Sequence, residues 1–419
     1  MTSDSVRLRF VAPLRHKTPP DGLAGEVAFL PMEAIGEDGT YDHDSVRSSV
    51  EIADGGYTYF EQGDVVRARV TPCFENGKGA LLSTLEGGQG LGTTELFVFR
   101  PTPLIHPRFL YYVTASQDFT EQGSATMYGA HGVRRVDERF ARNYRVWLPP
   151  IPVQRRIADY LDCETARIDA LTAAKQRMAS LLEERRIGAA HAMLTGQGVS
   201  GPRQPSGVPW LGDIPARWRM ARLGSLFDVQ LGRMLSAERS VGRHLRRYLR
   251  NINVRWGTVD TSDLAEMDFP PADRERYAVR SGDLLVNEGG AGIGRAAIWD
   301  GSIDEIYYQK SVHRIRARDH VSVRWLLEWF RVAVDRRVFE VEGNLATIPH
   351  VPAEALRQYR VPCPPHDDAA ALLSGFDAQA ERTGAVRETT ERQIALLQER
   401  RQAVITAAVT GEFLIPEPA

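Results

Sequence analysis

The feature that most constrains the fold is one long helical segment, residues 154–194. Pro149, Pro150 and Pro152 precede it, and proline is tolerated in the first turn of a helix. Gly196 follows it, where a left-handed C-cap would lie. At about 1.5 Å per residue the segment predicts a rod of roughly 60 Å. A helix of that length gains most of its stability by packing along a partner.

Apolar residues recur along this segment with a period of about 3.5 residues, the pattern of a helix that lies along another helix. The positions predicted to face the partner are Leu161, Ile168, Leu171, Met178 and Leu182. The predicted partner is the C-terminal segment of the same chain. Its pairing positions are expected at Phe376, Val386, Leu397 and Val404.

The C-terminal segment is a copy of the first helix at a constant offset, which carries Tyr144 onto Tyr359 without any gap. The copy includes residues before, within and after the helix, so a chance match between two helices rich in arginine, glutamate and leucine is a poor alternative. The same offset carries Arg7-Leu8 onto Arg222-Leu223, which predicts that the whole unit is duplicated. The matching pairs are Tyr144-Arg145-Val146 and Tyr359-Arg360-Val361, Pro149-Pro150 and Pro364-Pro365, Asp162 and Asp377, Glu184-Arg185-Arg186 and Glu399-Arg400-Arg401, and Thr195-Gly196 and Thr410-Gly411.

The second helix has a weaker sequence. Gly375 and Gly384 interrupt it, and each costs about 1 kcal/mol relative to alanine in a helix. Thr383, Thr390 and Gln393 stand where apolar interface residues are expected. The sequence leaves open whether this helix is continuous or bends and frays near its start.

Two mixed domains of short strands and helices are expected beside the long helices, so the predicted fold class is α+β with an internal duplication. Gly63-Asp64 opens a strand in the first domain, and Gly282-Asp283 is its counterpart in the second, while the loops differ in length and sequence. The predicted boundaries are residues 1–150 for the first domain, 151–196 for the first long helix, 197–208 for a linker, 209–365 for the second domain, 366–412 for the second long helix and 413–419 for a tail.

Arginine is concentrated in the second domain, although the formal net charge of the chain is only −2. Residues 217–255 contain ten arginines against Asp228 and Glu238, a local excess of eight positive charges. A general preference for arginine over lysine contributes to this count, but it does not explain the missing acids. Such an excess is typical of a surface that faces phosphates.

Candidate DNA-contacting residues lie in strands and loops of both domains. A glycine-rich loop that ends at Arg134 and Arg135 is one such element, and an ordinary surface connection is its alternative interpretation. The candidates of the first domain are Arg67, Arg69, Lys78, His131, Arg134 and Arg135. Those of the second domain are Arg233, Arg243, Arg246, Arg247, Arg250, Arg255, Arg295, Lys310 and Arg314.

No catalytic or metal-binding constellation is expected. Cys73, Cys163 and Cys363 form no CxxC pair, which argues against a zinc site or a disulfide framework and for a reducing compartment. The glycine run at residues 289–294 lacks the GK[ST] ending of a nucleotide-binding loop, so a tight turn is the better interpretation. No signal peptide and no apolar run of about eighteen residues is found, and we expect a cytoplasmic protein.

Taken together, these motifs resemble the specificity subunit of a type I restriction-modification enzyme over the whole chain. They are a Gly-Asp pair followed by a strand, a glycine loop and an arginine, the YRV..PP sequence, RIDAL with its degenerate copy RTGAV, and LLEERR with LTGQ. In that family, two target-recognition domains each read one half of a bipartite, asymmetric DNA sequence, and the two helices pack as an antiparallel coiled coil. The resemblance implies sequence-specific binding to double-stranded DNA by a chain that is not itself an enzyme.

The resemblance also implies partner subunits. The helices would hold two methyltransferase (modification) subunits, and restriction subunits with ATP-driven translocation would join them. S-adenosylmethionine, ATP and Mg²⁺ are therefore expected in the partners, and no cofactor or metal is expected in this chain. The assembled complex would be a DNA adenine methyltransferase and an ATP-dependent endonuclease.

Two alternatives from other classes remain. A coiled-coil adaptor with two protein-binding domains would explain the helices but not the arginine-rich stretch. A stand-alone DNA-modifying enzyme would explain a DNA-facing surface but lacks the expected motifs.

Overall fold

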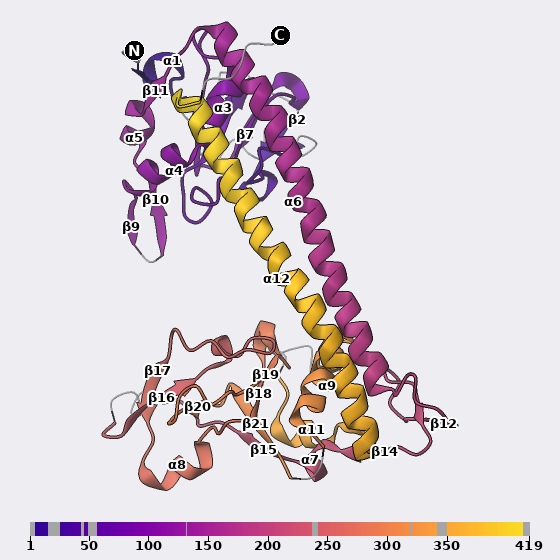
Figure 1. Ribbon diagram of the computed structural model, residues 1–419. Helices are drawn as coiled ribbons and strands as arrows, with labels where there is room; N and C mark the ends of the chain where they lie inside the picture. Colours follow the sequence, from indigo (N-terminus) through magenta and orange to yellow (C-terminus); the bar gives the residue numbers. More distant parts are fainter. Residues whose placement is uncertain are drawn as a thin grey trace. The chain divides into compact units, whose positions relative to one another are not determined.

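The protein's structure is a computed structural model in which the chain forms two compact units (Figure 1). Unit 1 is Met1–Gln176 with Glu391–Ala419, and unit 2 is Arg177–Thr390. The structure describes residues 5–15, 26–42, 46–48, 57–130, 132–236, 242–318, 321–341 and 350–413. Each unit combines a mixed body of strands and short helices with one end of each long helix.

The two long helices are α6 (Ile151–Leu194) and α12 (His366–Thr410), with 44 and 45 residues. Each ends before a glycine in the left-handed region, Gly196 with a φ of 64° and Gly411 with a φ of 80°. A side chain with a Cβ would strain that C-cap. α12 runs without a break through Gly375 and Gly384, so the helix whose continuity the sequence left open is continuous.

Inside each unit, one end of α6 lies beside one end of α12 (Figure 1). In unit 1, Leu161 near the start of α6 belongs to the same core as Ile405 and Val409 near the end of α12. In unit 2, Leu194 at the end of α6 belongs to the same core as Phe376 near the start of α12. The start of each helix meets the end of the other, which confirms the predicted antiparallel pairing.

The predicted pairing positions are only partly confirmed. The buried or half-buried ones are Leu161, Ile168, Leu182, Phe376, Leu397 and Val404. Leu171, Met178 and Val386 are instead 46%, 41% and 43% exposed, and their assignment to the helix interface is wrong.

Threonines occupy inward positions on both helices, as the sequence analysis expected for Thr390 but not for Thr165 and Thr172. Thr165 is buried and Thr172, seven residues later, is half-buried, whereas the neighbouring Leu171 is exposed. On α12, Thr390 is buried and Gln393 is exposed. The hydroxyls of Thr165 and Thr390 each donate to the carbonyl four residues earlier in their own helix, at 2.7 and 2.8 Å. The helices therefore keep the heptad register through polar residues whose hydrogen bonds are satisfied locally.

The body of unit 1 contains two small sheets. One has the strand order β6 (Gly79–Leu81), β5 (Val65–Ala68), β8 (Leu96–Phe99), and the other β3 (Val46–Ser48), β2 (Glu26–Leu30), β7 (Gln89–Gly92), β4 (Thr58–Glu61). Shorter pairs are β1 (Ser5–Arg7) with β11 (Arg145–Trp147), and β9 (Tyr128–Ala130) with β10 (Val133–Arg135). The short helices are α1 (Leu8–Val11), α3 (Pro107–Ala115), α4 (Gln117–Ser124) and α5 (Glu138–Asn143).

The body of unit 2 has a related arrangement. Its main sheet has the order β15 (Phe227–Leu231), β21 (Val312–Ala317), β18 (Leu284–Asn287), β19 (Ala296–Ile298), and the second β17 (Ala265–Asp268), β16 (Leu245–Leu249), β20 (Tyr307–Tyr308). The two-stranded pairs are β14 (Arg219–Arg222) with β22 (Arg360–Cys363), and β12 (Arg203–Pro205) with β13 (Asp213–Pro215). The short helices are α7 (Leu223–Leu226), α8 (Pro271–Tyr277), α9 (Val323–Asp335), α10 (Val338–Val341) and α11 (Ala353–Gln358). β12 lies within residues 197–208, so part of the predicted linker is a paired strand.

The duplication is visible in the strand register. β1 pairs with β11 so that Val6 lies opposite Val146, and β14 pairs with β22 so that Ala221 lies opposite Val361. Both partners of the second pair follow those of the first by the same offset that carries Tyr144 onto Tyr359 in the sequence. The predicted internal duplication is confirmed.

A buried aspartate organises the central sheet of each body. Asp64 in unit 1 and Asp283 in unit 2 are 1% and 2% exposed, and each follows a glycine with a φ of 92° or 87°. Asp64 accepts two hydrogen bonds of 2.7 Å from Arg100, and Asp283 accepts two of 2.7 Å from Arg316. Two-point pairing of this kind is among the stronger ionic contacts in proteins, so the Gly-Asp motif fixes the same turn and the same strand pair twice.

The continuity of α12 leads to a stability prediction. A Cβ added at Gly375 or Gly384 would meet no atom within 4 Å. Gly384→Ala and Gly375→Ala should each stabilise the protein by about 1 kcal/mol, measured as a higher melting temperature, because alanine restricts the unfolded chain and favours the helix. The matched control is Gly123→Ala in α4, where a Cβ would lie 2.4 Å from the Phe74 ring and should destabilise the protein. A melting temperature lowered by Gly384→Ala would contradict an uninterrupted α12.

Candidate nucleic-acid interface

Arg67 supports a loop from inside the protein. The residue is 1% exposed, and its side chain donates to the carbonyl oxygens of Gly77 at 2.6 Å and Phe74 at 3.0 Å and to the Thr120 hydroxyl at 2.9 Å. Burial lowers the pKa of Arg67 to about 10, which leaves the guanidinium charged at neutral pH. The predicted DNA contact by Arg67 is wrong, because the side chain holds the loop at residues 73–79 and does not reach the surface.

Two further candidates of unit 1 have protein partners at the surface. Lys78 donates to the carbonyl of Met32 at 3.0 Å. Arg135 forms a two-point ion pair with Glu95, with a shortest distance of 2.7 Å. Contact with DNA by these two residues stays a prediction, and it would require each to exchange or share its present partner.

The β9–β10 hairpin is the most exposed of the predicted contact elements in unit 1. Tyr128 and Val133 are 56% and 44% exposed. Arg134 is exposed beside them and lies 3.6 Å from Glu75, a weak pairing in solvent. His131 lies outside the described residues. In the hairpin register Tyr128 lies opposite Arg135 and Arg134 lies opposite Gly129, so the hairpin presents an exposed aromatic ring and an exposed arginine on its two faces.

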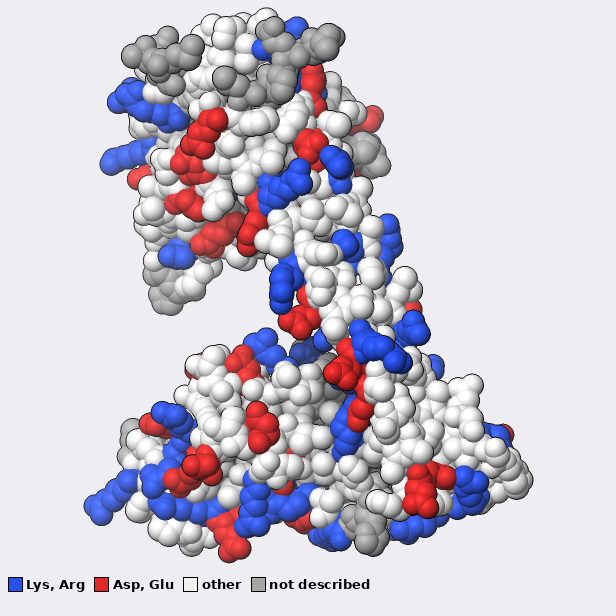
Figure 2. Space-filling view, viewed as in Figure 1, with Lys and Arg blue, Asp and Glu red and all other residues white. Residues whose placement is uncertain are grey.

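Many of the arginines counted in residues 217–255 are neutralised by acids from elsewhere in unit 2. Figure 2 shows Lys and Arg side chains interleaved with Asp and Glu side chains on the visible face of this unit. Since these acids follow residue 255 in the sequence, the count over the window overstates the charge of the folded surface. The pairs are Arg233 with Asp273, Arg246 with Glu305, Arg250 with Asp263 and Arg255 with Asp260.

Four of the predicted cations of unit 2 are exposed and also lack a side-chain partner among the described residues. They are Arg243, Arg247, Arg295 and Lys310, and none of their side chains makes a hydrogen bond or ion pair with the described residues. An unpaired, solvated cation loses little when it contacts a phosphate, and it releases counterions from DNA. These four are the strongest candidates for phosphate contacts.

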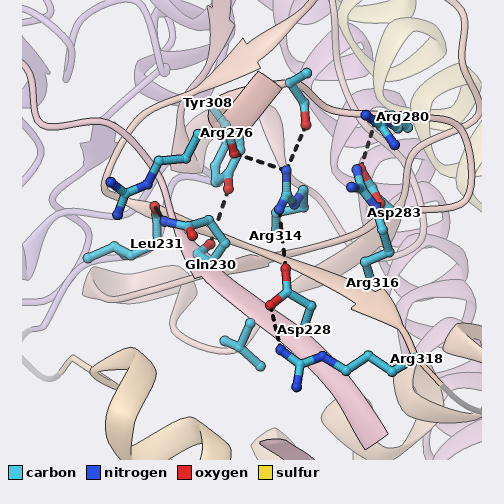
Figure 3. Close-up of polar contacts among 12 residues, drawn as sticks. Asp228, Gln230, Leu231, Arg276, Arg280, Asp283, Tyr308, Arg314, Arg316 and Arg318 are labelled. Atoms are coloured by element: carbon cyan, nitrogen blue, oxygen red, sulfur yellow. Dashed lines mark hydrogen bonds and ion pairs between the residues drawn. The ribbon is translucent and has the colours of Figure 1, made fainter. Parts of the chain in front are cut away.

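Arg314 is a structural residue of the main sheet (Figure 3). It is 5% exposed, and it donates to the carbonyl oxygens of Arg276 at 3.1 Å and Ala278 at 3.0 Å and to Asp228 at 3.4 Å. Asp228 also accepts from Arg318 at 2.8 Å. Burial opposes ionisation of Asp228, but these arginines outweigh it and lower its pKa. The predicted DNA contact by Arg314 is wrong, because its buried side chain, which comes from β21, bonds to Asp228 of β15 and to carbonyl oxygens at the end of α8.

The glycine run at residues 289–294 forms the tight turn that the sequence predicted. Gly290 and Gly294 have φ values of 77° and 72°. A Cβ on Gly294 would lie 2.7 Å from both Phe339 and Val334, so this glycine lets the turn approach its neighbours closely. The glycines allow the backbone to make this turn, and Arg295, which follows them, is exposed.

Glu288 is a polar residue of this region that the sequence analysis did not single out. It follows β18 directly and is half-buried, and burial raises the pKa of its carboxyl group. Its carboxylate makes no hydrogen bond or ion pair within the described part of the chain, although Lys310 and His350 lie near enough to favour its charged form.

Across the described ranges, no group of three or more His, Cys, Asp or Glu side chains could hold a metal ion. Among the helices of those ranges, none has the length and apolar character that crossing a membrane requires. Cys73, Cys163 and Cys363 are not in disulfides.

Comparisons with known proteins support the family resemblance. No family model matches the chain. The specificity subunit of the type I restriction enzyme EcoAI from Escherichia coli is 24% identical over 435 aligned positions, which cover 84% of this chain and 73% of the relative. That of EcoEI, also from Escherichia coli, is 37% identical over 155 positions, which cover 36% of this chain and 26% of the relative. The chain is thus similar to type I specificity subunits, as its motifs indicated.

A solved structure has the same fold. A chain from a structure described as the basis of complex assembly and conformational transition of the type I R-M system matches with a TM-score of 0.71 at 18% identity and covers 98% of both chains. The predicted fold class, with mixed bodies and two long paired helices, is confirmed by this likeness and by the arrangement described above.

The contrast between solvated and buried arginines leads to a binding prediction. Alanine at both Arg243 and Arg247 should leave the melting temperature unchanged, weaken binding to all DNA sequences and reduce the slope of log affinity against log salt by about one per lost contact. Arg314→Ala should instead lower the melting temperature of unit 2, because it removes a buried side chain together with its hydrogen bonds to the carbonyl oxygens of Arg276 and Ala278. Thermal unfolding and salt-titrated mobility shifts measure the two effects. An unchanged salt slope in the double variant would show that this surface does not face phosphates.

Proposed function

We propose that this chain is the non-catalytic, sequence-specific DNA-binding subunit of a type I restriction-modification complex. The observation that carries the proposal is a duplicated framework along the whole chain, combined with similarity to the EcoAI specificity subunit over most of both proteins. An adaptor with two protein-binding domains would also use paired helices. It does not account for the exposed cations of unit 2 or for the relatives.

Each body is proposed to read one half of a bipartite, asymmetric DNA site. The two bodies share the buried Asp–Arg pair and the strand register around it, so they are built on the same framework. Their surfaces differ, since unit 1 presents the β9–β10 hairpin and unit 2 presents Arg243, Arg247 and Arg295. A common framework with different surfaces suits two readers of different sequences.

The long helices are proposed to dock two methyltransferase subunits. Apolar side chains of the helices remain exposed in each unit, Leu171 and Leu396 in unit 1 and Met178, Leu181 and Val386 in unit 2. The offset of the duplication carries Leu171 onto Val386 and Leu181 onto Leu396. The duplication therefore supplies two equivalent apolar positions on the two helices, which suits two copies of one partner.

The chemistry of such a complex would reside in its partners. The methyltransferase subunits would bind S-adenosylmethionine and methylate adenine, and restriction subunits would use ATP and Mg²⁺ for translocation and cleavage. The assembly is proposed to act in the cytoplasm, where the DNA is.

Methylome sequencing tests the proposal. A host that expresses this chain with a methyltransferase subunit should acquire adenine methylation at a motif with two different halves and a nonspecific gap. The same host without this chain should lack that motif. Methylation that does not depend on the chain, or one continuous motif, would contradict the proposal and favour an adaptor role.

Independent reading by the two bodies leads to a second prediction. Replacing residues 1–145 with the matching region of a relative should change one half of the methylated motif and leave the other half and the gap intact, because the framework strands and helices are retained. The readout is again the methylome. A replacement that alters both halves would rule out independent readers.

A further inference from the structure

Arg69 of unit 1 and Glu288 of unit 2 occupy the same position in the duplicated framework. Each lies five residues after the buried aspartate that opens the central strand, Asp64 or Asp283. Each is also the first residue beyond that framework strand, β5 or β18. Arg69 and Glu288 are therefore structurally equivalent positions of the two bodies.

The backbone hydrogen bonds of the two positions agree. Each N–H donates to the chain just before the neighbouring strand, and each carbonyl accepts from the start of the segment that leads to α5 or α11. The bonds are Arg69 N–H to Glu95 O and Glu288 N–H to Ser311 O, both 2.9 Å, and Val136 N–H to Arg69 O and Val351 N–H to Glu288 O, both 2.8 Å. Equal bonds at equal positions show that the backbone is the same while the side chain differs in the sign of its charge.

Neither side chain forms the several hydrogen bonds to the protein that buried charged groups such as Arg67 and Arg314 form. Arg69 is half-buried with its guanidinium 5.1 Å from the centre of the Phe97 ring, and its Nε has no hydrogen-bond partner in the described residues. The Glu288 carboxylate likewise has no hydrogen bond or ion pair there. By contrast, Arg67 and Arg314 each donate several hydrogen bonds to the protein. A half-buried charged group without a hydrogen-bond partner costs stability, which is expected where a ligand supplies that partner.

We propose that these two residues are equivalent specificity determinants, with Arg69 reading a guanine in one half-site and Glu288 reading a cytosine in the other. The inference rests on the proposed function and deepens it by naming base-reading positions. Both residues follow an inner strand of their sheet and lie near predicted contact elements. Val70, next to Arg69, bridges Arg135 of β10, whereas Asn287, next to Glu288, donates its N–H to the carbonyl of Arg295, and Lys310 lies near Glu288.

The choice of cytosine follows from the chemistry of a carboxylate. Phosphates repel it, so next to DNA it is favourable only where it accepts a hydrogen bond from a base. In the major groove cytosine offers its N4 amino group, whereas the amino group of adenine stands beside the N7 acceptor, which would face the second carboxylate oxygen. Burial raises the pKa of Glu288, and the nearby His350 and Lys310 oppose that shift only in part.

The choice of guanine follows from the same pattern for Arg69. The guanidinium is a two-point donor that matches guanine O6 and N7, the commonest specific contact in protein–DNA complexes. Its planar face is already set against the Phe97 ring, which reduces the number of conformations it must give up on binding. Glu138, an acid that lines the same small cavity as Arg69, is paired with Arg142 and so does not compete for it.

The test uses the full chain in complex with a methyltransferase subunit, read by methylome sequencing. Glu288→Ala should make one G·C position of one half-site degenerate, with a loss of discrimination of roughly ten- to hundredfold, and leave the other half intact. Glu288→Gln keeps the shape of the side chain and should shift preference at that same position toward adenine, which glutamine pairs through N6 and N7. Arg69→Ala should relax one guanine in the opposite half-site.

Controls separate this inference from the proposed function and from misfolding. Glu275→Gln removes an exposed acid of unit 2 and should leave the motif unchanged, while Arg247→Ala should weaken binding at all sequences without altering the motif. A wild-type complex that yields no bipartite motif defeats the proposed function itself. A normal wild-type motif that is unchanged in Glu288→Gln and Glu288→Ala, or methylated less at every site equally, overturns only the base-reading role.

Discussion

The charge of Glu328, a fully buried residue of α9, is satisfied by arginines, and this ties the body of unit 2 to the ends of both long helices. Glu328 accepts from Arg186 of α6 at 2.9 Å and from Arg324 of α9 at 2.6 Å. Arg324 also donates to Asp377 of α12 at 2.6 Å. Replacing Glu328 with alanine should cost about 3–5 kcal/mol, because Arg186 then loses the acid that pairs with it. Body and helix ends in this unit therefore fold as one structure.

Unit 1 is anchored at positions related by the same duplication. Arg108 of α3 donates to Asp162 of α6, and Asp162 is the counterpart of Asp377 in the duplicated sequence. Arg401 of α12 is the counterpart of Arg186 and donates to an aspartate of α6 at 2.9 Å. These ionic anchors explain how the helix pair tolerates threonines along its interface, since register is set at the ends of the helices. Because these anchors lie at the helix ends, residues on the surfaces of the two bodies can differ without disturbing the helix pair.

The fold could be predicted because it depends on patterns that are local or repeated, namely the proline and glycine ends of the helices and the constant offset. The candidate site could be predicted only in part. Arg67 is buried because its short strand packs under a loop. The number of charged residues in a stretch of sequence does not reveal such burial. Asp263, the acid that pairs with Arg250, lies thirteen residues later in the sequence and therefore outside residues 217–255. Glu288 could have been found by extending the Gly-Asp alignment five residues, which sets it against Arg69.

If the antiparallel helices hold the two readers apart, helix length sets the gap between the half-sites. Inserting four residues beside Ala173-Ala174, about one turn, lengthens α6 by at most about 6 Å. DNA rises about 3.4 Å per base pair, so the methylated motif should gain one base pair in its gap, two at the limit, with both halves unchanged. Inserting two residues should disrupt assembly instead, because it turns the interface of α6 by about 200°. A four-residue variant that methylates a motif with an unaltered gap would contradict the role of the helices as a spacer.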